Sequence, residues 1–132
     1  MMRFIPAAIT LVALAGCQSS SVGPSTPATR EVVVAQGATT TITNGLTVKF
    51  VAVAGDSRCP GDATCITGGD AVVKLQVTSG GAAREVELHT GNQQPVTSDG
   101  ATFELLQLMP YPFSSLPPIA PGDYRATLRV TR

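Results

Sequence analysis

Two cysteines stand close together in a stretch of turn-forming residues. The segment DSRCPGDATC begins at Asp56 and holds Cys59 and Cys65, two of the three cysteines in the chain. Thiols at this spacing could bind a metal ion, take part in redox chemistry or form a disulfide bond. A zinc site needs two further ligands, and the chain has only one histidine, His89. A thioredoxin-type motif has two residues between its cysteines, next to a βαβ unit. Both of these patterns fit the segment poorly.

The third cysteine ends an apolar run near the N-terminus. Arg3 is followed by an uncharged segment over residues 4–15, which is shorter than the roughly 20 residues of a membrane-spanning helix. Its length and flanks are typical of a secretory signal peptide. The run ends in LAGC at Cys17, which resembles the lipobox of bacterial lipoproteins. The resemblance implies cleavage before Cys17, acylation of that cysteine and a stable membrane anchor of more than one acyl chain. An ordinary signal peptide and an N-terminal hydrophobic helix are the alternatives.

Export would decide the chemistry of the remaining cysteines. Disulfides form and persist in oxidising compartments outside the cytoplasm. Once Cys17 carries lipid, Cys59 and Cys65 remain as a pair. We therefore expect a Cys59–Cys65 disulfide that closes a short structural loop, and we expect no cofactor.

Composition divides the chain into three parts. We expect a lipoprotein signal peptide over 1–16, a lipidated cysteine with a flexible Ser/Pro-rich tether over 17–29, and one folded domain over 30–132. The tether has too few apolar side chains to offset the entropy of ordering it. The formal net charge of the chain is zero, which leaves no basic field for nucleic acid.

Alternating apolar and polar residues in the third part are typical of strands. No window has the i, i+3, i+4, i+7 spacing of a helix, and Asn44-Gly45 and Ser79-Gly80-Gly81 are tight-turn signals. The pattern predicts an all-β domain, a single immunoglobulin-like β-sandwich of about seven short strands. The expected strands cover residues 31–36, 39–42, 46–54, 71–77, 84–89, 102–109 and 124–131. In the third of these, alternate residues from Leu46 through Phe50 and Ala52 to Ala54 should share one face.

Half of the ten prolines lie between Met109 and Gly122. Proline has no amide donor, so this segment cannot be a central strand and should wrap the surface in extended form. The residues expected to give it apolar contacts are Tyr111, Phe113, Leu116 and Ile119. Tyr124, just past a Pro-Gly-Asp corner, resembles the tyrosine corner of immunoglobulin-like domains.

The sequence DSRCPGDATCITGGDAVVKL resembles a group of largely uncharacterised bacterial lipoproteins and exported proteins. The resemblance implies an exported β domain with a disulfide-closed loop, and it implies no established activity. Thr67 stands where many members of the group carry Trp, so an aromatic platform is absent there. The matching residues are Asp56, Ser57, Arg58, Cys59, Pro60, Cys65, Ile66 and Gly68 or Gly69.

The loop around the cysteines has two interpretations. Its polar side chains could form a recognition surface, because loops on rigid scaffolds often carry function. Alternatively, Asp56 and Arg58 satisfy main-chain groups and stiffen the loop, and we favour this interpretation. The candidate recognition residues are Asp56, Ser57, Arg58, Asp62 and Asp70.

Glu85, Glu87 and His89 should lie on one face of a strand, where they could bind a divalent metal or form an acid–base pair. Such a face is more often solvated and paired across strands, here with Arg125 or Arg129, so we expect no metal site. The sequence has no Gly-x-Ser-x-Gly elbow and no phosphate-binding loop before a helix. We therefore expect no enzymatic activity.

These observations predict a lipid-anchored, non-catalytic binding or scaffolding module of the cell envelope. Its partners would be the membrane, through the lipid on Cys17, and another envelope protein or polymer, with no nucleic acid. Gln18 after the lipidated cysteine resembles the sorting signal for the outer membrane, facing the periplasm, in a diderm bacterium. The alternatives are a peptidase-inhibitor-like β-sandwich and a metal-binding envelope domain that uses Glu85, Glu87 and His89.

Overall fold

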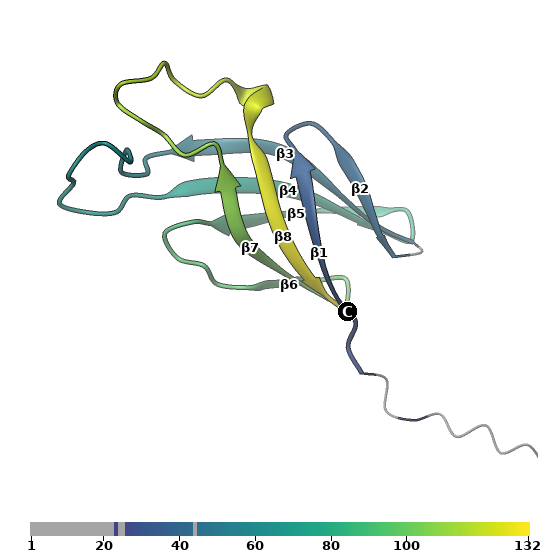
Figure 1. Ribbon diagram of the computed structural model, residues 1–132. Helices are drawn as coiled ribbons and strands as arrows, with labels where there is room; N and C mark the ends of the chain where they lie inside the picture. Colours follow the sequence, from purple (N-terminus) through teal and green to yellow (C-terminus); the bar gives the residue numbers. More distant parts are fainter. Residues whose placement is uncertain (1–22, 24–25, 44) are drawn as a thin grey trace, which may run out of the picture.

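Eight β-strands form in the part of the chain where apolar and polar residues alternate. The computed structural model describes residue 23 and residues 26–43 and 45–132, so Cys17 and the expected signal peptide lie outside the described residues. The strands form two packed four-stranded antiparallel sheets (Figure 1), which confirms the predicted all-β sandwich. They are β1 (Thr29–Ala35), β2 (Thr39–Thr43), β3 (Leu46–Asp56), β4 (Ala71–Ser79), β5 (Ala82–His89), β6 (Val96–Ser98), β7 (Ala101–Met109) and β8 (Arg125–Thr131).

The strands follow a meander. The first sheet has the order β1-β8-β7-β6 and the second has the order β2-β3-β4-β5. Strands that are consecutive in sequence therefore lie side by side within each sheet, except that β1 pairs with β8 from Thr29↔Thr131 to Ala35↔Arg125. Immunoglobulin domains use Greek-key connections instead. The sandwich is thus the predicted one, with a different connectivity.

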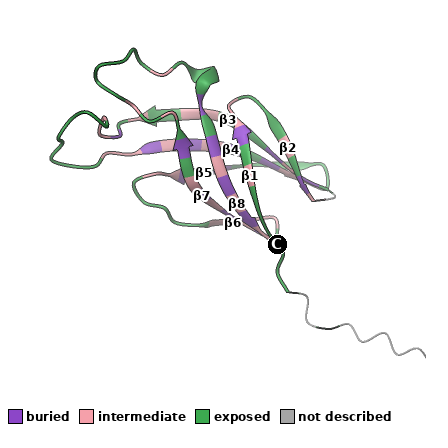
Figure 2. Ribbon diagram, in the orientation of Figure 1, coloured by how far each residue is buried: buried purple, intermediate pink, exposed green. Residues whose placement is uncertain are grey.

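The core lies between the two sheets, where the buried faces of the strands meet (Figure 2). Tyr124 and the inward residues of β8 are buried, as the alternation predicts. Full burial of a large apolar side chain contributes about 1.5–3 kcal/mol. The largest fully buried side chains are Phe50, Phe103, Leu46, Leu75, Leu88, Leu105, Leu128, Val34, Val48, Val73, Val77 and Val130.

A β-bulge changes the alternation within β3. The register with β4 shifts between Phe50 and Ala52, and such a shift places an extra residue in one strand of the pair. Beyond it Val53, rather than Ala52, packs against the core, and Ala54 is exposed. The prediction of one continuous alternation through Ala54 is therefore wrong beyond Phe50.

Two tight turns confirm one predicted hairpin and reveal one that was missed. Gly80 and Gly81 have positive φ angles of 57° and 82° and join β4 to β5. Asp99 and Gly100, with φ angles of 52° and 75°, join β6 to β7 between two of the expected strands, where none was predicted. Asp-Gly is itself a hairpin signal, but the three residues of β6 are too few to show a period.

Two long connections lie at one end of the sandwich, which we call the loop end. Residues 57–70, the disulfide loop, join β3 to β4, and residues 110–124, the proline strap, join β7 to β8. The strap forms no strand, as the prolines predict, and contains a short 3₁₀ turn at Pro121–Asp123. At the opposite end, the Ala28 N–H donates to the Arg132 carbonyl at 2.8 Å, so the chain enters the domain beside its C-terminus (Figure 1). None of the described residues form a helix with the length and hydropathy that crossing a bilayer requires.

Candidate functional site

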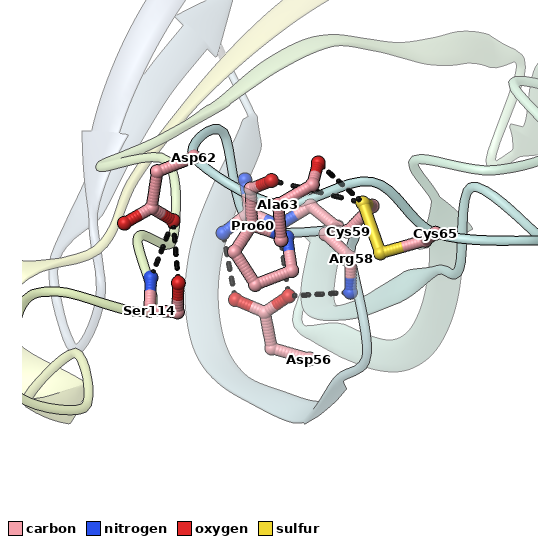
Figure 3. Close-up of a disulfide and its surroundings, with 8 residues drawn as sticks. All are labelled: Asp56, Arg58, Cys59, Pro60, Asp62, Ala63, Cys65 and Ser114. Atoms are coloured by element: carbon pink, nitrogen blue, oxygen red, sulfur yellow. Dashed lines mark hydrogen bonds and ion pairs between the residues drawn. A yellow bond between two sulfur atoms is a disulfide. The ribbon is translucent and has the colours of Figure 1, made fainter.

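Cys59 and Cys65 form the predicted disulfide, with their Cα atoms 5.9 Å apart (Figure 3). Main-chain hydrogen bonds close the same loop at its base. The Cys59 N–H donates to the Gly68 carbonyl at 3.0 Å, and the Ser57 N–H donates to the Asp70 carbonyl at 2.7 Å. The disulfide loop therefore has a fixed base as well as a covalent cross-link.

Replacing both cysteines with serine should lower the free energy of unfolding by about 2 kcal/mol, because a cross-link over a short loop restricts the unfolded chain by about that much. Urea unfolding followed by circular dichroism measures the change, and the reduced wild-type protein provides a second reading of the same loss. A variant that no longer folds would contradict this estimate, because the disulfide would then contribute far more to stability than the closure of one short loop.

Arg58 is the buried charge of the loop end, with a side chain that is 5% exposed. Its Nε donates to Asp56 Oδ1 at 2.8 Å and its Nη2 donates to Asp56 Oδ2 at 2.6 Å. Two main-chain carbonyls accept the remaining bonds: Nη1 donates to Leu108 at 2.7 Å and Nη2 to Pro110 at 3.0 Å. The guanidinium also lies 5.1 Å from the centre of the Tyr111 ring, within the range of a cation–π contact. One side chain thus joins the disulfide loop to β7 and to the strap.

Tyr124 completes this group. Its hydroxyl donates to Asp56 Oδ2 at 2.8 Å, whereas in a tyrosine corner the hydroxyl bonds to the main chain a few residues upstream. Burial would raise the pKa of Asp56, but hydrogen bonds from Arg58 and Tyr124 outweigh it and hold that pKa below its ordinary value. We call Asp56, Arg58 and Tyr124, with the carbonyls of Leu108 and Pro110, the Arg58 clamp.

The hydroxyl of Tyr124 should lose its proton at a higher pH than an ordinary tyrosine. Burial and the hydrogen bond to Asp56 raise the pKa of Tyr124 to about 12, from an ordinary 10.0. Because the pKa of Tyr124 is higher in the folded than in the unfolded protein, the protonated hydroxyl stabilises the fold. This stabilisation is fully present below about pH 10 and is lost as the pH rises toward 12. In a Tyr111→Phe variant, Tyr124 is the sole tyrosine of the two in the chain, and tyrosinate absorbance reports it alone. A midpoint near pH 10, with circular dichroism still native, would contradict this hydrogen bond.

Asp62 joins the disulfide loop to the strap. Its Oδ1 accepts hydrogen bonds from the N–H and the hydroxyl of Ser114, at 2.7 and 2.8 Å, and its Oδ2 accepts one from the Ser115 N–H at 2.9 Å (Figure 3 shows the Ser114 bonds). These bonds hold the pKa of Asp62 well below its usual range. The Gly61 N–H donates to the Pro112 carbonyl at 2.9 Å. The disulfide loop and the strap are therefore packed as one unit.

Asp70 ties the base of the disulfide loop to the residues that follow β5. Its Oδ2 lies 2.6 Å from His89 Nδ1, and its Oδ1 accepts the Gly91 N–H at 2.8 Å. Burial would raise the pKa of Asp70, but the hydrogen bonds from Gly91 and His89 outweigh it and lower that pKa. The Ser57 hydroxyl donates to the Asp70 carbonyl at 2.9 Å. The side chains of Ser57 and Asp70 therefore both form hydrogen bonds within the loop end.

Glu85 and Glu87 face solvent on β5, as predicted, but their cation partner differs from the expected one. Lys74, on the neighbouring strand β4, lies 3.2 Å from Glu85 and 3.5 Å from Glu87. Arg125 and Arg129, the expected partners, belong to β8 in the other sheet. The expectation that they pair with the two glutamates is therefore wrong.

His89 contacts Asp70 rather than Lys74, through its Nδ1. Glu85 and Glu87 thus share Lys74 as their partner, whereas His89 pairs with Asp70. Within the described ranges, no cluster of three or more His, Cys, Asp and Glu side chains could hold a metal ion.

All five candidate recognition residues lie at the loop end, and their side chains brace it. Asp56 and Arg58 are inside the clamp, Ser57 and Asp70 close the base of the loop, and both carboxylate oxygens of Asp62 are bonded to the strap. This geometry agrees with the bracing interpretation that the sequence favoured for Asp56 and Arg58.

Exposed apolar side chains gather at the same end, and the sequence did not single them out as a surface. They are five of the seven large hydrophobic residues that are exposed in the described residues. The Tyr111 and Phe113 rings meet edge to face with centroids 6.5 Å apart, and both line a cleft of about 290 Å³ with Leu116. We call the five residues the apolar patch: Ile66, Met109, Tyr111, Phe113 and Leu116.

A larger cleft, of about 510 Å³, lies between the base of the disulfide loop, the segment after β5 and the last residues of β7. We call it the β7 cleft. Its lining residues are Arg58, Gly68, Gly69, Thr90, Gly91, Gln93, Leu106, Gln107, Leu108, Met109 and Tyr111.

No model of a known protein family matches the sequence, and comparisons with curated proteins and with solved structures found no match. What is established is therefore an all-β, two-sheet domain with one disulfide and a braced loop end that exposes apolar side chains.

Proposed function

We propose that this protein is a lipid-anchored binding or scaffolding module of the cell envelope, without catalytic activity, that contacts its partner through the loop end. The apolar patch is the observation that carries the proposal. Single exposed apolar residues are ordinary, but a group of them on one part of a surface marks an interaction site. Leu116 is 62% exposed and Ile66 is fully exposed, so both are free to contact another molecule.

The bracing of the loop end supports the same function. Binding costs free energy when loops and side chains must be ordered at the interface, and a preorganised surface avoids much of that cost. Here the disulfide, the Arg58 clamp and the Asp62 bonds hold the disulfide loop and the strap before any partner arrives.

The position of the chain entry supports membrane attachment through the N-terminus. The domain begins beside Arg132, at the end opposite the apolar patch. A lipid on Cys17 and a tether over 18–29, with a reach of about 20 Å, would hold that end near a membrane and leave the loop end free. The lipobox-like LAGC and the DSRCP pattern are the reasons for proposing the lipid and the envelope location, with the outer membrane favoured in a diderm bacterium.

Site-specific photo-crosslinking in intact cells tests the binding surface. A photoreactive residue at Ile66 or Leu116 should give a discrete adduct with one partner. Val33 is the matched control, because it is 66% exposed but lies on β1, away from the loop end. Adducts from all three positions alike, or from none, would refute the proposed surface.

Mass spectrometry of the protein purified from its native membranes tests the anchor. We expect a mature chain that begins at Cys17 and carries acyl groups, and a Cys17→Ser variant that leaves the membrane fraction. An unmodified N-terminus upstream of Cys17 would refute this part of the proposal.

Ile66 favours a peptidase inhibitor as the second candidate. It stands fully exposed next to Cys65, on a loop that is closed by the disulfide, and a rigid loop with one projecting side chain could enter a peptidase cleft. Inhibition of a panel of extracytoplasmic peptidases, lost in Ile66→Glu, would support this candidate. Absence of inhibition across the panel would eliminate it.

A further inference from the structure

The outer edge of β7 is only partly covered. β6 pairs with β7 over residues 101–103 alone, and in the part of the chain that the structure describes no strand pairs with the rest of this edge, residues 104–109. The pairing therefore ends where β7 still continues.

The register identifies the main-chain groups that this leaves free. A two-residue hairpin turn is closed by a hydrogen-bonded pair, here Ser98 and Ala101. Peptide groups alternate sides along a strand, so Phe103 and Leu105 also direct their N–H and C=O groups toward the side of β6. Phe103 lies opposite Val96, whereas Leu105 lies beyond the last residue of β6. An added strand would find its first hydrogen-bonding position at Leu105. The register of β7 shifts between Leu105 and Gln107, and the Leu108 carbonyl already accepts a hydrogen bond from Arg58, so the open edge ends before Leu108.

The β7 cleft lies beside this edge and is electrically neutral. Arg58 is its only charged lining residue, and the carboxylate of Asp56 neutralises that charge through two hydrogen bonds. The other polar lining groups include the amides of Gln93 and Gln107, which donate and accept hydrogen bonds as a main chain does. Such a lining suits an uncharged polar chain.

The opposite wall of the cleft leaves room for a main chain. It includes Gly68, where an added Cβ would meet no atom within 4 Å, so another backbone can approach there. Leu106, Met109 and Tyr111 line the remaining surface and offer apolar contacts to alternate side chains of an extended segment. A neutral oligosaccharide would also suit the amides, but it would leave the free strand edge unused.

We propose that the β7 cleft binds an extended, uncharged polypeptide segment of a partner protein, which adds to the first sheet alongside residues 104–107 of β7. Strand addition of this kind uses main-chain hydrogen bonds for affinity and side-chain pockets for specificity. Four residues of strand span roughly 13 Å, so a short segment of about that length would fill the edge. This inference rests on the proposed binding function and names the chemistry of the partner.

The test uses the full chain in detergent micelles and two probes: peptides selected from a phage-displayed random heptapeptide library, and chitotetraose as an uncharged oligosaccharide. Gly68→Trp should fill the cleft without disturbing the domain, since no atom lies within 4 Å of an added Cβ there. Gly55→Trp is the matched control, because its Cβ also meets open space and Gly55 does not line the cleft.

We expect selected peptides to bind the wild type and Gly55→Trp equally, to lose at least about tenfold in affinity for Gly68→Trp, about 1.4 kcal/mol, and to slow hydrogen exchange of the Leu105 amide. Failure to select any peptide, equal binding to both variants, or protection of the cleft by chitotetraose instead would overturn the inference. The photo-crosslinking from Ile66 and Leu116 is independent of these results. Crosslinks without cleft binding would leave the binding module intact and remove only strand addition.

Discussion

Replacing Arg58 with methionine is expected to lower the free energy of unfolding by about 3–5 kcal/mol, the usual cost of removing one partner from a buried ion pair. The substitution leaves the Asp56 carboxylate, whose side chain is 11% exposed, without its guanidinium. The carbonyls of Leu108 and Pro110 lose their donor at the same time. Since the total free energy of unfolding of a native protein is only about 5–15 kcal/mol, this variant should be close to unfolding.

Urea unfolding followed by circular dichroism measures the effect, and two further variants identify its cause. Arg58→Lys keeps the charge but cannot reproduce the planar fork that reaches both Asp56 oxygens and the two carbonyls, so it should fall between wild type and Arg58→Met. Adding Asp56→Asn to Arg58→Met removes the unpaired charge and should cost less than the sum of the single changes. A loss below about 1 kcal/mol for Arg58→Met, as at an exposed ion pair, would contradict the clamp.

Replacing Gly69 with alanine should be the second most damaging change, at about 3 kcal/mol or more. An added Cβ would lie 1.8 Å from the carbonyl oxygen of Ser57 and 2.6 Å from its carbonyl carbon. These are main-chain atoms at the base of the disulfide loop, so no side-chain rotation relieves the overlap. The φ angle of +66° is also unfavourable for any residue with a Cβ.

Gly68→Ala is the control for this prediction. It changes the neighbouring residue in the same loop, where an added Cβ meets no atom within 4 Å. We expect its stability to stay within about 0.5 kcal/mol of the wild type. Equal effects of the two substitutions in urea unfolding would mean that the base of the loop is not closed as described.

Most of the strands and the disulfide could be predicted from the sequence. Alternation located seven of the eight strands, and the spacing and expected compartment of Cys59 and Cys65 led to their pairing. The missed strand, β6, has three residues and is too short to show a period. The bulge after Phe50 was missed because it depends on how β3 pairs with β4, which the sequence of β3 alone does not contain.

The contacts within the site were harder to predict from the sequence than the fold. The sequence favoured a bracing role for Asp56 and Arg58, but their partners lie far along the chain: Leu108 is 50 residues from Arg58, and Tyr124 is 68 residues from Asp56. Contacts of this range follow from the way two long connections pack at one end of the sandwich. The partner of Glu85 and Glu87 was missed for a related reason. Lys74 lies beside them on the neighbouring strand, and the alternation within a strand does not indicate which strands share a sheet.

The strap shows the same limit for apolar residues. Four apolar residues of the strap were expected to supply packing contacts. Ile119 does pack against the core, but Tyr111, Phe113 and Leu116 are substantially exposed. Apolar composition does not distinguish a residue that covers the core from one that faces a partner. The distinction appears only once the strap is placed over the disulfide loop by Asp62 and Gly61.

The central claim is that the disulfide loop and the strap form one braced surface before any partner binds. Hydrogen exchange of three loop amides tests it most directly: the N–H groups of Ser57, Cys59 and Gly61, which donate to Asp70, Gly68 and Pro112. We expect all three to exchange as slowly as amides within the strands in the free wild-type protein, and much faster in Arg58→Met. Exchange in the free wild type at the rate of an unstructured peptide would contradict the claim.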